Sequence, residues 1–72
     1  MTIDCIFKLN NNTDDIINKF SLKKILKNTR VSIYENNDMR FSFYDKVVRV
    51  LVFKNKQQVV DNLYHYFYGG ES

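Results

Sequence analysis

The stretch that most constrains the fold is the apolar run from Lys46 to Phe53, in which four of the eight residues are valine. Branched and aromatic side chains of this kind fit a pleated, half-buried surface. A run of this length suits a strand and is far too short to cross a membrane as a helix. We interpret it as a buried strand and ask which other segments pair with it.

A second strand is predicted near the N-terminus, where apolar and polar side chains alternate. The alternation places Ile3, Cys5, Phe7 and Leu9 on one face, and Thr2, Asp4, Ile6 and Lys8 on the other. This is the period of a strand with one buried side. On that side Cys5 is expected to behave as a small hydrophobe rather than as a reactive thiol. A single cysteine cannot form an internal disulfide, and no spaced set of Cys and His residues predicts a metal site.

A helix is predicted to follow the asparagine loop at residues 10–12, with Asn12 or Thr13 as its N-cap. Asp14 and Asp15 then occupy the first turn, where the helix dipole favours negative charge. The apolar positions change phase after residue 20, which predicts a bend or break near Phe20 and Ser21. As an N-cap, Ser21 would start a second short helix. The alternative is one helix buried on both sides, which would imply a partner or a dimer.

Two further strands, residues 30–35 and 39–44, precede the central run and are predicted to form a meander with it. A three-residue hairpin loop at 36–38 would pair Ile33 with Phe41 and Val31 with Phe43. A two-residue turn at 45–46 pairs Phe43 with Val48, Phe41 with Val50 and Met39 with Val52. In this register one face carries Val31, Ile33, Phe41, Phe43, Val48, Val50 and Val52.

The last helix is predicted to begin at Asn55, with Gln58 as its capping-box partner, and to end near Gly69. Its apolar stripe comprises Val59, Val60, Leu63, Tyr66 and Phe67. The predicted architecture is therefore an α+β fold in the order β-α-β-β-β-α, a single domain over residues 1–72 with a short disordered tail at 70–72. An antiparallel three-stranded meander and the N-terminal strand carry both helices on one face. The pattern leaves open whether the first strand lies beside residues 30–35 or beside 46–54.

The opposite face of this sheet is the candidate binding surface, because no helix is expected to cover it. Tyrosine, arginine and large apolar groups together are typical of the centre of a protein interface. The predicted partner-binding residues are Tyr34, Arg40, Tyr44, Arg49, Leu51 and Phe53.

A basic cluster offers a second hypothesis. The net charge is +3 and the pI about 9.1, and five cations are expected at or near the end of the first helical region: Lys19, Lys23, Lys24, Lys27 and Arg30. They would form a phosphate-binding patch, and hence a nucleic-acid-binding site. The chain has no alanine, proline or tryptophan and is rich in residues encoded by A+T-rich codons, so lysine content alone is weak support for this reading.

The sequence argues against an enzyme. It contains no glycine-rich phosphate loop, no metal-ligand set and no nucleophile beside His65, and neither a cofactor nor a membrane segment is expected. Without a signal-peptide pattern, we expect a cytoplasmic protein. The preferred hypothesis is a small binding protein that occupies a protein partner's surface. Size and composition suit an inhibitor or regulator encoded by a phage or mobile element, of the anti-restriction or anti-CRISPR type. A third hypothesis is self-association as a homodimer or structural module.

Overall fold

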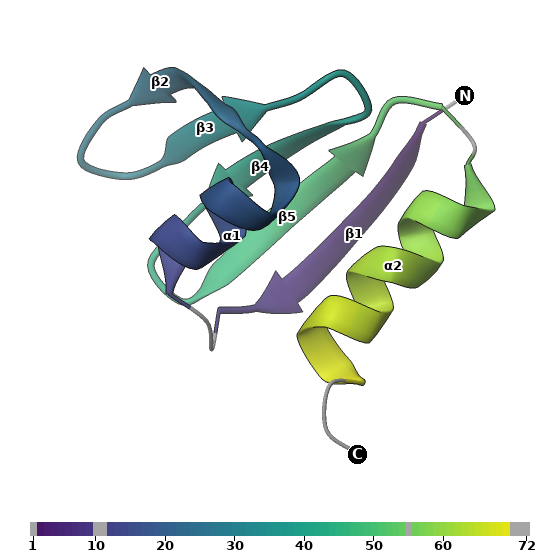
Figure 1. The fold of residues 1–72 in the computed structure, drawn as a ribbon. Helices are drawn as coiled ribbons and strands as arrows, with labels where there is room; N and C mark the ends of the chain where they lie inside the picture. The colour runs from purple at the N-terminus through teal and green to yellow at the C-terminus, as the bar shows by residue number, and fades with distance from the viewer. Residues whose placement is uncertain (1, 10–11, 55, 70–72) are drawn as a thin grey trace.

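The fold was described from a computed structural model, which places residues 2–9, 12–54 and 56–69. Its elements in chain order are β1 (Ile3–Lys8), α1 (Thr13–Phe20), β2 (Lys23–Lys27), β3 (Ser32–Glu35), β4 (Met39–Phe43), β5 (Val47–Val52) and α2 (Gln57–Tyr68). The strands form one antiparallel sheet in the order β1-β5-β4-β3-β2. Both helices lie on the same face of this sheet (Figure 1). The predicted α+β class and the order of the predicted elements are confirmed.

The N-terminal strand lies beside the central run, which settles the placement that the pattern left open. β1 pairs antiparallel with β5, with Cys5 opposite Val50 and Phe7 opposite Val48. β5 is therefore covered by a strand on each side, as its valine content suggests. The predicted register of β4 with β5 is confirmed, since Phe41 lies opposite Val50 and Phe43 opposite Val48.

The second short helix predicted after Ser21 is wrong, because this segment forms strand β2. The break itself lies where it was expected. Ser21 adopts the left-handed conformation with φ of 54° and caps the end of α1 rather than starting a helix. Its N–H donates to the Asn18 carbonyl, and the Leu22 N–H donates to the Ile17 carbonyl. This is a Schellman motif, which ends a helix and turns the chain out of it, so that Leu22 is buried and the next residues run extended.

The predicted register of the first hairpin is also wrong, by one residue. Tyr34 lies opposite Phe41 and Ile33 opposite Ser42. Tyr34 of β3 therefore faces the helices, and Ile33 faces away from them. The loop is a two-residue turn, because the Asn36 N–H bonds the Met39 carbonyl and extends the ladder. The Asn36 side-chain oxygen also accepts from the N–H groups of Asp38 and Met39, at 2.8 and 2.9 Å. These side-chain hydrogen bonds close the turn, and no residue of it adopts the left-handed conformation that a three-residue loop requires.

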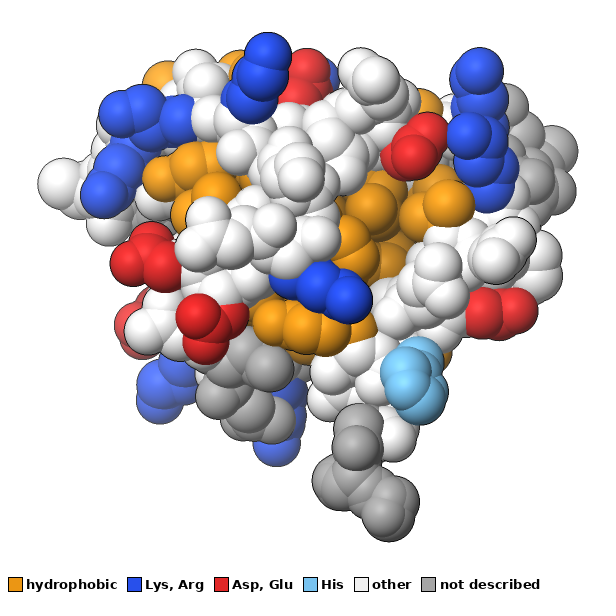
Figure 2. Space-filling view, viewed as in Figure 1, with side chains coloured by type: hydrophobic (Ala, Val, Ile, Leu, Met, Phe, Trp, Pro, Cys, Tyr) orange, Lys and Arg blue, Asp and Glu red, His pale blue; other side chains and the backbone are white. Residues whose placement is uncertain are grey.

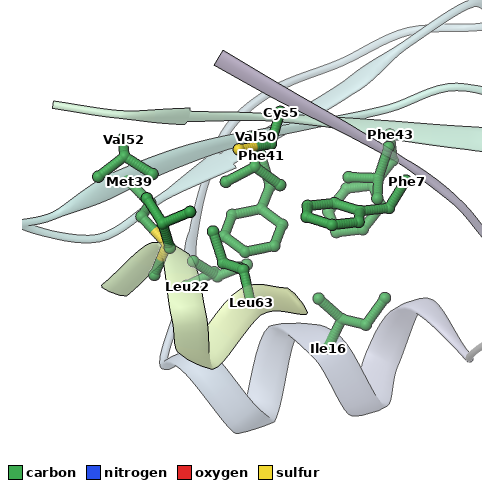
Figure 3. Packing of buried hydrophobic residues seen from close by; sticks show 12 residues of the cluster. Cys5, Phe7, Ile16, Leu22, Met39, Phe41, Phe43, Val50, Val52 and Leu63 are labelled. Carbon is green, nitrogen blue, oxygen red and sulfur yellow. The ribbon is translucent and has the colours of Figure 1, made fainter. Parts of the chain in front are cut away.

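The hydrophobic core lies between the sheet and the two helices. Phe7, Phe41, Val48, Val50 and Val52 project from the sheet and are at most 1% exposed. Ile16 of α1 and Leu63 of α2 meet them from the other layer at 0% exposure, as the close view in Figure 3 shows. Aromatic rings contribute much of this contact, with Phe7 stacked on Phe67 at a centroid distance of 4.4 Å. Cys5 is buried on this side, as predicted.

Helix α2 presents the predicted stripe to the core. Val60 and Leu63 are buried, and Val59, Tyr66 and Phe67 pack against the cluster as half-buried side chains. The N-cap of the helix is Lys56, without a side-chain capping bond, so the helix begins later than predicted. The predicted cap Asn55 lies outside the described residues, as does the tail at 70–72. The cap of α1 is as predicted, since the Asn12 side chain accepts from the Asp14 N–H at 2.7 Å.

Candidate protein-binding face

The side of the sheet opposite the helices, called here the outer face, is organised in cross-strand rows. Because residues opposite one another in a ladder share a face, the strand registers determine the members of each row. One row, the charged row, runs across all five strands through Asp4, Leu51, Arg40, Glu35 and Lys23. The neighbouring row, the apolar-ended row, runs through Ile6, Arg49, Ser42, Ile33 and Leu26.

The predicted binding residues meet between these rows. A shallow depression of about 210 Å³ is lined by Ile33, Arg40, Ser42, Tyr44, Arg49 and Leu51. Four of the six predicted residues line it, namely Arg40, Tyr44, Arg49 and Leu51. A fifth, Phe53, lies under Arg40, whose guanidinium carbon is 6.0 Å from the ring centroid. The β4–β5 register brings these five together.

Tyr34 does not join them, which corrects the sequence-based placement. The one-residue change of register turns its ring to the helix side, where it meets Phe43 edge-on with centroids 5.8 Å apart. Ile33 takes its place on the outer face. Ser32 likewise lies opposite Phe43 on the inner side.

Ile6 is a further residue of this face that the sequence-based list omits. It lies opposite Arg49 and is 64% exposed. The sequence already indicated this placement, because Ile6 is the one large apolar residue on the polar side of the alternation at residues 2–9. Leu26, at the other end of the same row, is 47% exposed. A large aliphatic side chain is therefore exposed to solvent at each end of the row.

Arg49 is held in place by Asp4 from the neighbouring strand. Its Nε lies 3.0 Å from both carboxylate oxygens, and Nη2 contacts Oδ2 as well. This side-chain hydrogen bonding to Arg49 lowers the pKa of Asp4 below its usual value, and the same pair raises the pKa of Arg49. Both side chains are exposed to solvent, so the pair adds little to folding stability. Its effect is to orient the guanidinium across the sheet surface.

Arg40 is held in a similar way by two groups. Its Nε donates to Glu35 Oε1 at 3.1 Å, while the guanidinium lies over Phe53. An arginine stacked on an aromatic ring and bonded to a carboxylate keeps a restricted orientation, which lowers the entropy lost on binding. Both arginines of the face therefore carry their own counter-ions, Asp4 and Glu35.

The five cations of the basic cluster are arranged differently from the sequence-based expectation. Lys19 lies in the last turn of α1, and Arg30 lies in the loop after β2. Lys23, Lys24 and Lys27 belong to an edge strand rather than to a helix. Lys23 belongs to the charged row, whereas Lys24 lies opposite Tyr34 and so on the helix side. The lysines therefore project to both sides of the sheet.

Cys5 and His65 are two further groups with the potential for chemistry. Burial raises the pKa of the Cys5 thiol, and a side-chain hydrogen bond with Tyr64 offsets part of that rise. Asp61, one turn before His65, accepts from the Gln57 amide at 2.9 Å. Within residues 2–9, 12–54 and 56–69, no group of three His, Cys, Asp or Glu side chains is placed to hold a metal ion. None of the helices in that part of the chain is long and apolar enough to cross a membrane.

No protein-family model matches the sequence, and neither the curated proteins nor the solved structures include a significant match.

Proposed function

We propose that this chain is a small, non-enzymatic, cytoplasmic binding protein that acts by occupying the surface of a protein partner with its outer face. The observation that carries the proposal is the depression between the two rows, where Arg40, Tyr44, Arg49 and Leu51 converge. Arginine and tyrosine are enriched among the residues that dominate binding energy at protein interfaces. They surround an apolar centre here, on the face that neither helix covers (Figure 1).

The charges of the face support a protein partner over a nucleic acid. Binding to a phosphate backbone depends on free cations that replace counter-ions. Arg49 and Arg40 instead contact Asp4 and Glu35, whose carboxylates would repel phosphates. A protein surface with alternating signs and apolar contacts fits such a face without breaking either ion pair.

In its finer form, the proposal is that the protein inhibits or regulates a host system as the product of a phage or mobile element. What supports this is the small size, the A+T-rich residue usage and the arginine- and tyrosine-lined outer face. A domain of this size can cover a functional surface of a larger protein.

The test is an affinity capture from a low-G+C bacterial lysate, with the wild type compared with three variants. Arg49→Glu and Tyr44→Ala alter the outer face, and Lys19→Glu reverses an exposed charge on α1 as a matched control. Circular dichroism first confirms that each variant is folded. The capture is done at about 0.3 M salt, where interactions between exposed charges are strongly screened, with and without nuclease.

We expect a stoichiometric protein that survives nuclease and is retained by Lys19→Glu but lost with both outer-face variants. Equal recovery by Arg49→Glu, Tyr44→Ala and the wild type would remove this face as the binding site. Recovery of nucleic acid alone would favour a nucleic-acid-binding regulator. A melting temperature that rises with the concentration of the purified protein would instead indicate a homodimer.

A further inference from the structure

Strand β2 forms an edge of the sheet. It pairs with β3 and is the last strand in the sheet order, so among the described residues the N–H and C=O groups on its other side have no strand partner. All five of its residues are exposed, in contrast to every other strand of the sheet. The opposite edge strand, β1, has α2 lying alongside it, whereas β2 stands apart from α2 (Figure 1).

The side chains of this edge combine cations with exposed aliphatic groups. Ile25 is 53% exposed and Leu26 is 47% exposed, and they are flanked by Lys23, Lys24 and Lys27. The ion pairs of the described residues use other cations, so these three lysines are not neutralised there. Glu35 lies opposite Lys23 in the ladder, but its carboxylate is bonded to Arg40. Figure 2 shows Lys and Arg side chains beside hydrophobic ones in the region where β2 and β3 lie.

We infer that the free edge of β2 binds an acidic, extended peptide segment of a partner protein by strand addition. The main chain of such a segment would bond the open side of β2, and its carboxylates would meet the lysines. Ile25 also lines, with Phe20, an open depression of about 450 Å³ beside the strand, whose two carboxylates, Glu35 and Asp38, are already paired with cations. That depression can receive an apolar side chain of the added segment, which is how strand-addition sites gain specificity.

The same features disfavour two other occupants. A second copy paired antiparallel about Ile25 would place Lys23 opposite Lys27, and like charges directly opposite one another destabilise a strand pair. A nucleic acid would use the lysines, but Lys23 and Lys24 project to opposite sides of the sheet and the aliphatic pair would contribute nothing to phosphate binding. Lysines and a β-bulge, which β2 has between Lys24 and Leu26, also protect an edge from aggregation. In β2 the lysines favour an added peptide strand that is acidic over one that is neutral or basic.

The test uses the purified full chain and three labelled probes. The first probe is a seven-residue peptide that alternates glutamate with valine. The second is the same peptide N-methylated at its five central residues, which therefore have no main-chain N–H to donate along either edge. The third is a twelve-nucleotide oligothymidine. Binding is measured by fluorescence anisotropy, and amide hydrogen exchange of residues 23–27 is followed by NMR.

We expect the acidic peptide to bind at or below about 1 mM and to slow amide exchange within β2. N-methylation should weaken binding about tenfold or more, because several main-chain hydrogen bonds are lost together. The double variant Lys24→Glu/Lys27→Glu should weaken binding by a similar factor. The matched control Lys46→Glu/Lys54→Glu has the same net charge and should bind within about twofold of the wild type. Arg49→Glu should also retain the peptide, since it alters the outer face and not this edge.

Four results would overturn the inference. One is no binding of the acidic peptide at about 1 mM. A second is equal affinity for the N-methylated peptide, which would mean charge attraction without strand addition. A third is protection of β2 by oligothymidine but not by the peptide, which would assign the edge to nucleic acid. The last is protection of β2 that rises with protein concentration in the absence of any probe, which would mean pairing with a second copy.

Discussion

Replacing Tyr34 should destabilise the domain far more than replacing its neighbour Ile33, because the hairpin register turns Tyr34 toward the helices. Threonine is the matched replacement at both positions, since it preserves the preference for a strand. Tyr34 is half-buried on the inner side, with its ring edge-on to Phe43. Ile33 lies on the outer face against Ser42.

The expected cost follows from the contact that each change removes. A tyrosine buries about 150–250 Å² when fully covered, so the half-buried Tyr34 contributes roughly 100 Å² of contact. At about 25 cal/mol per Å², this corresponds to about 2–3 kcal/mol of unfolding free energy. Ile33 is also half-buried, but it is a smaller side chain and does not pack against the core cluster, so Ile33→Thr should cost only about 1 kcal/mol.

Thermal unfolding followed by circular dichroism measures the difference directly. For a domain of this size, about 1 kcal/mol shifts the melting temperature by about 4–8 °C, so Tyr34→Thr should lower it by roughly 10–20 °C. Ile33→Thr should lower it by a few degrees. If Ile33→Thr were the more damaging change, the register with Ile33 opposite Phe41 would be correct and the outer face would have to be redrawn.

Three further predictions concern single residues. Ser21→Gly should raise the unfolding free energy by about 0.5–1 kcal/mol in a urea titration, because glycine adopts φ of 54° without strain, whereas Ser21→Val should lower it. Cys5 should react with a thiol reagent at pH 8 far more slowly in the folded protein than in urea, and fast labelling of the folded protein would contradict its burial. Asp4 should add a small stabilisation, and only while it is ionised. Its pKa is lowered in the folded state, so its contribution is present above the unfolded pKa of about 3.9 and is lost as the pH falls through the lower folded value. The difference in melting temperature between the wild type and Asp4→Asn should therefore narrow below about pH 4, and a constant difference would contradict the pairing with Arg49.

The sequence predicts those strands in which only one of the two sets of alternating side chains can face the core. In β4 and β5, Phe41, Phe43 and Val50 alternate with arginines, so a wrong register would bury a charge. The predicted binding residues on these two strands accordingly lie together. β3 has no such constraint, because Ile33 and Tyr34 are both acceptable on either face. Its parity is decided by the Asn36 side chain, a contact that residue type alone does not reveal.

Neither strand β2 nor the Asp4–Arg49 pair could be predicted from the sequence pattern, for two different reasons. An edge strand with every side chain exposed has no burial alternation to detect, and Leu22, Ile25 and Leu26 have the spacing of a helical face. The turn at Ser21 depends on a non-glycine residue in a left-handed conformation, which residue type seldom predicts. Asp4 and Arg49 are brought together by the placement of β1, a long-range pairing that local periodicity does not specify.

The pairing of β1 with β5 also determines the order in which the protein can fold during synthesis. Residues 3–8 are synthesised before their partner at residues 47–52, so β1 has no strand to pair with until β5 has been made. The meander from β3 to β5 has only local connections and can form without β1. Pairing of β1 with β5, in contrast, closes a loop of about forty residues. Until then the apolar side chains of Cys5 and Phe7 remain available to other chains. Aggregation of the nascent protein should therefore depend more on how fast β5 is completed than on the stability of the finished fold.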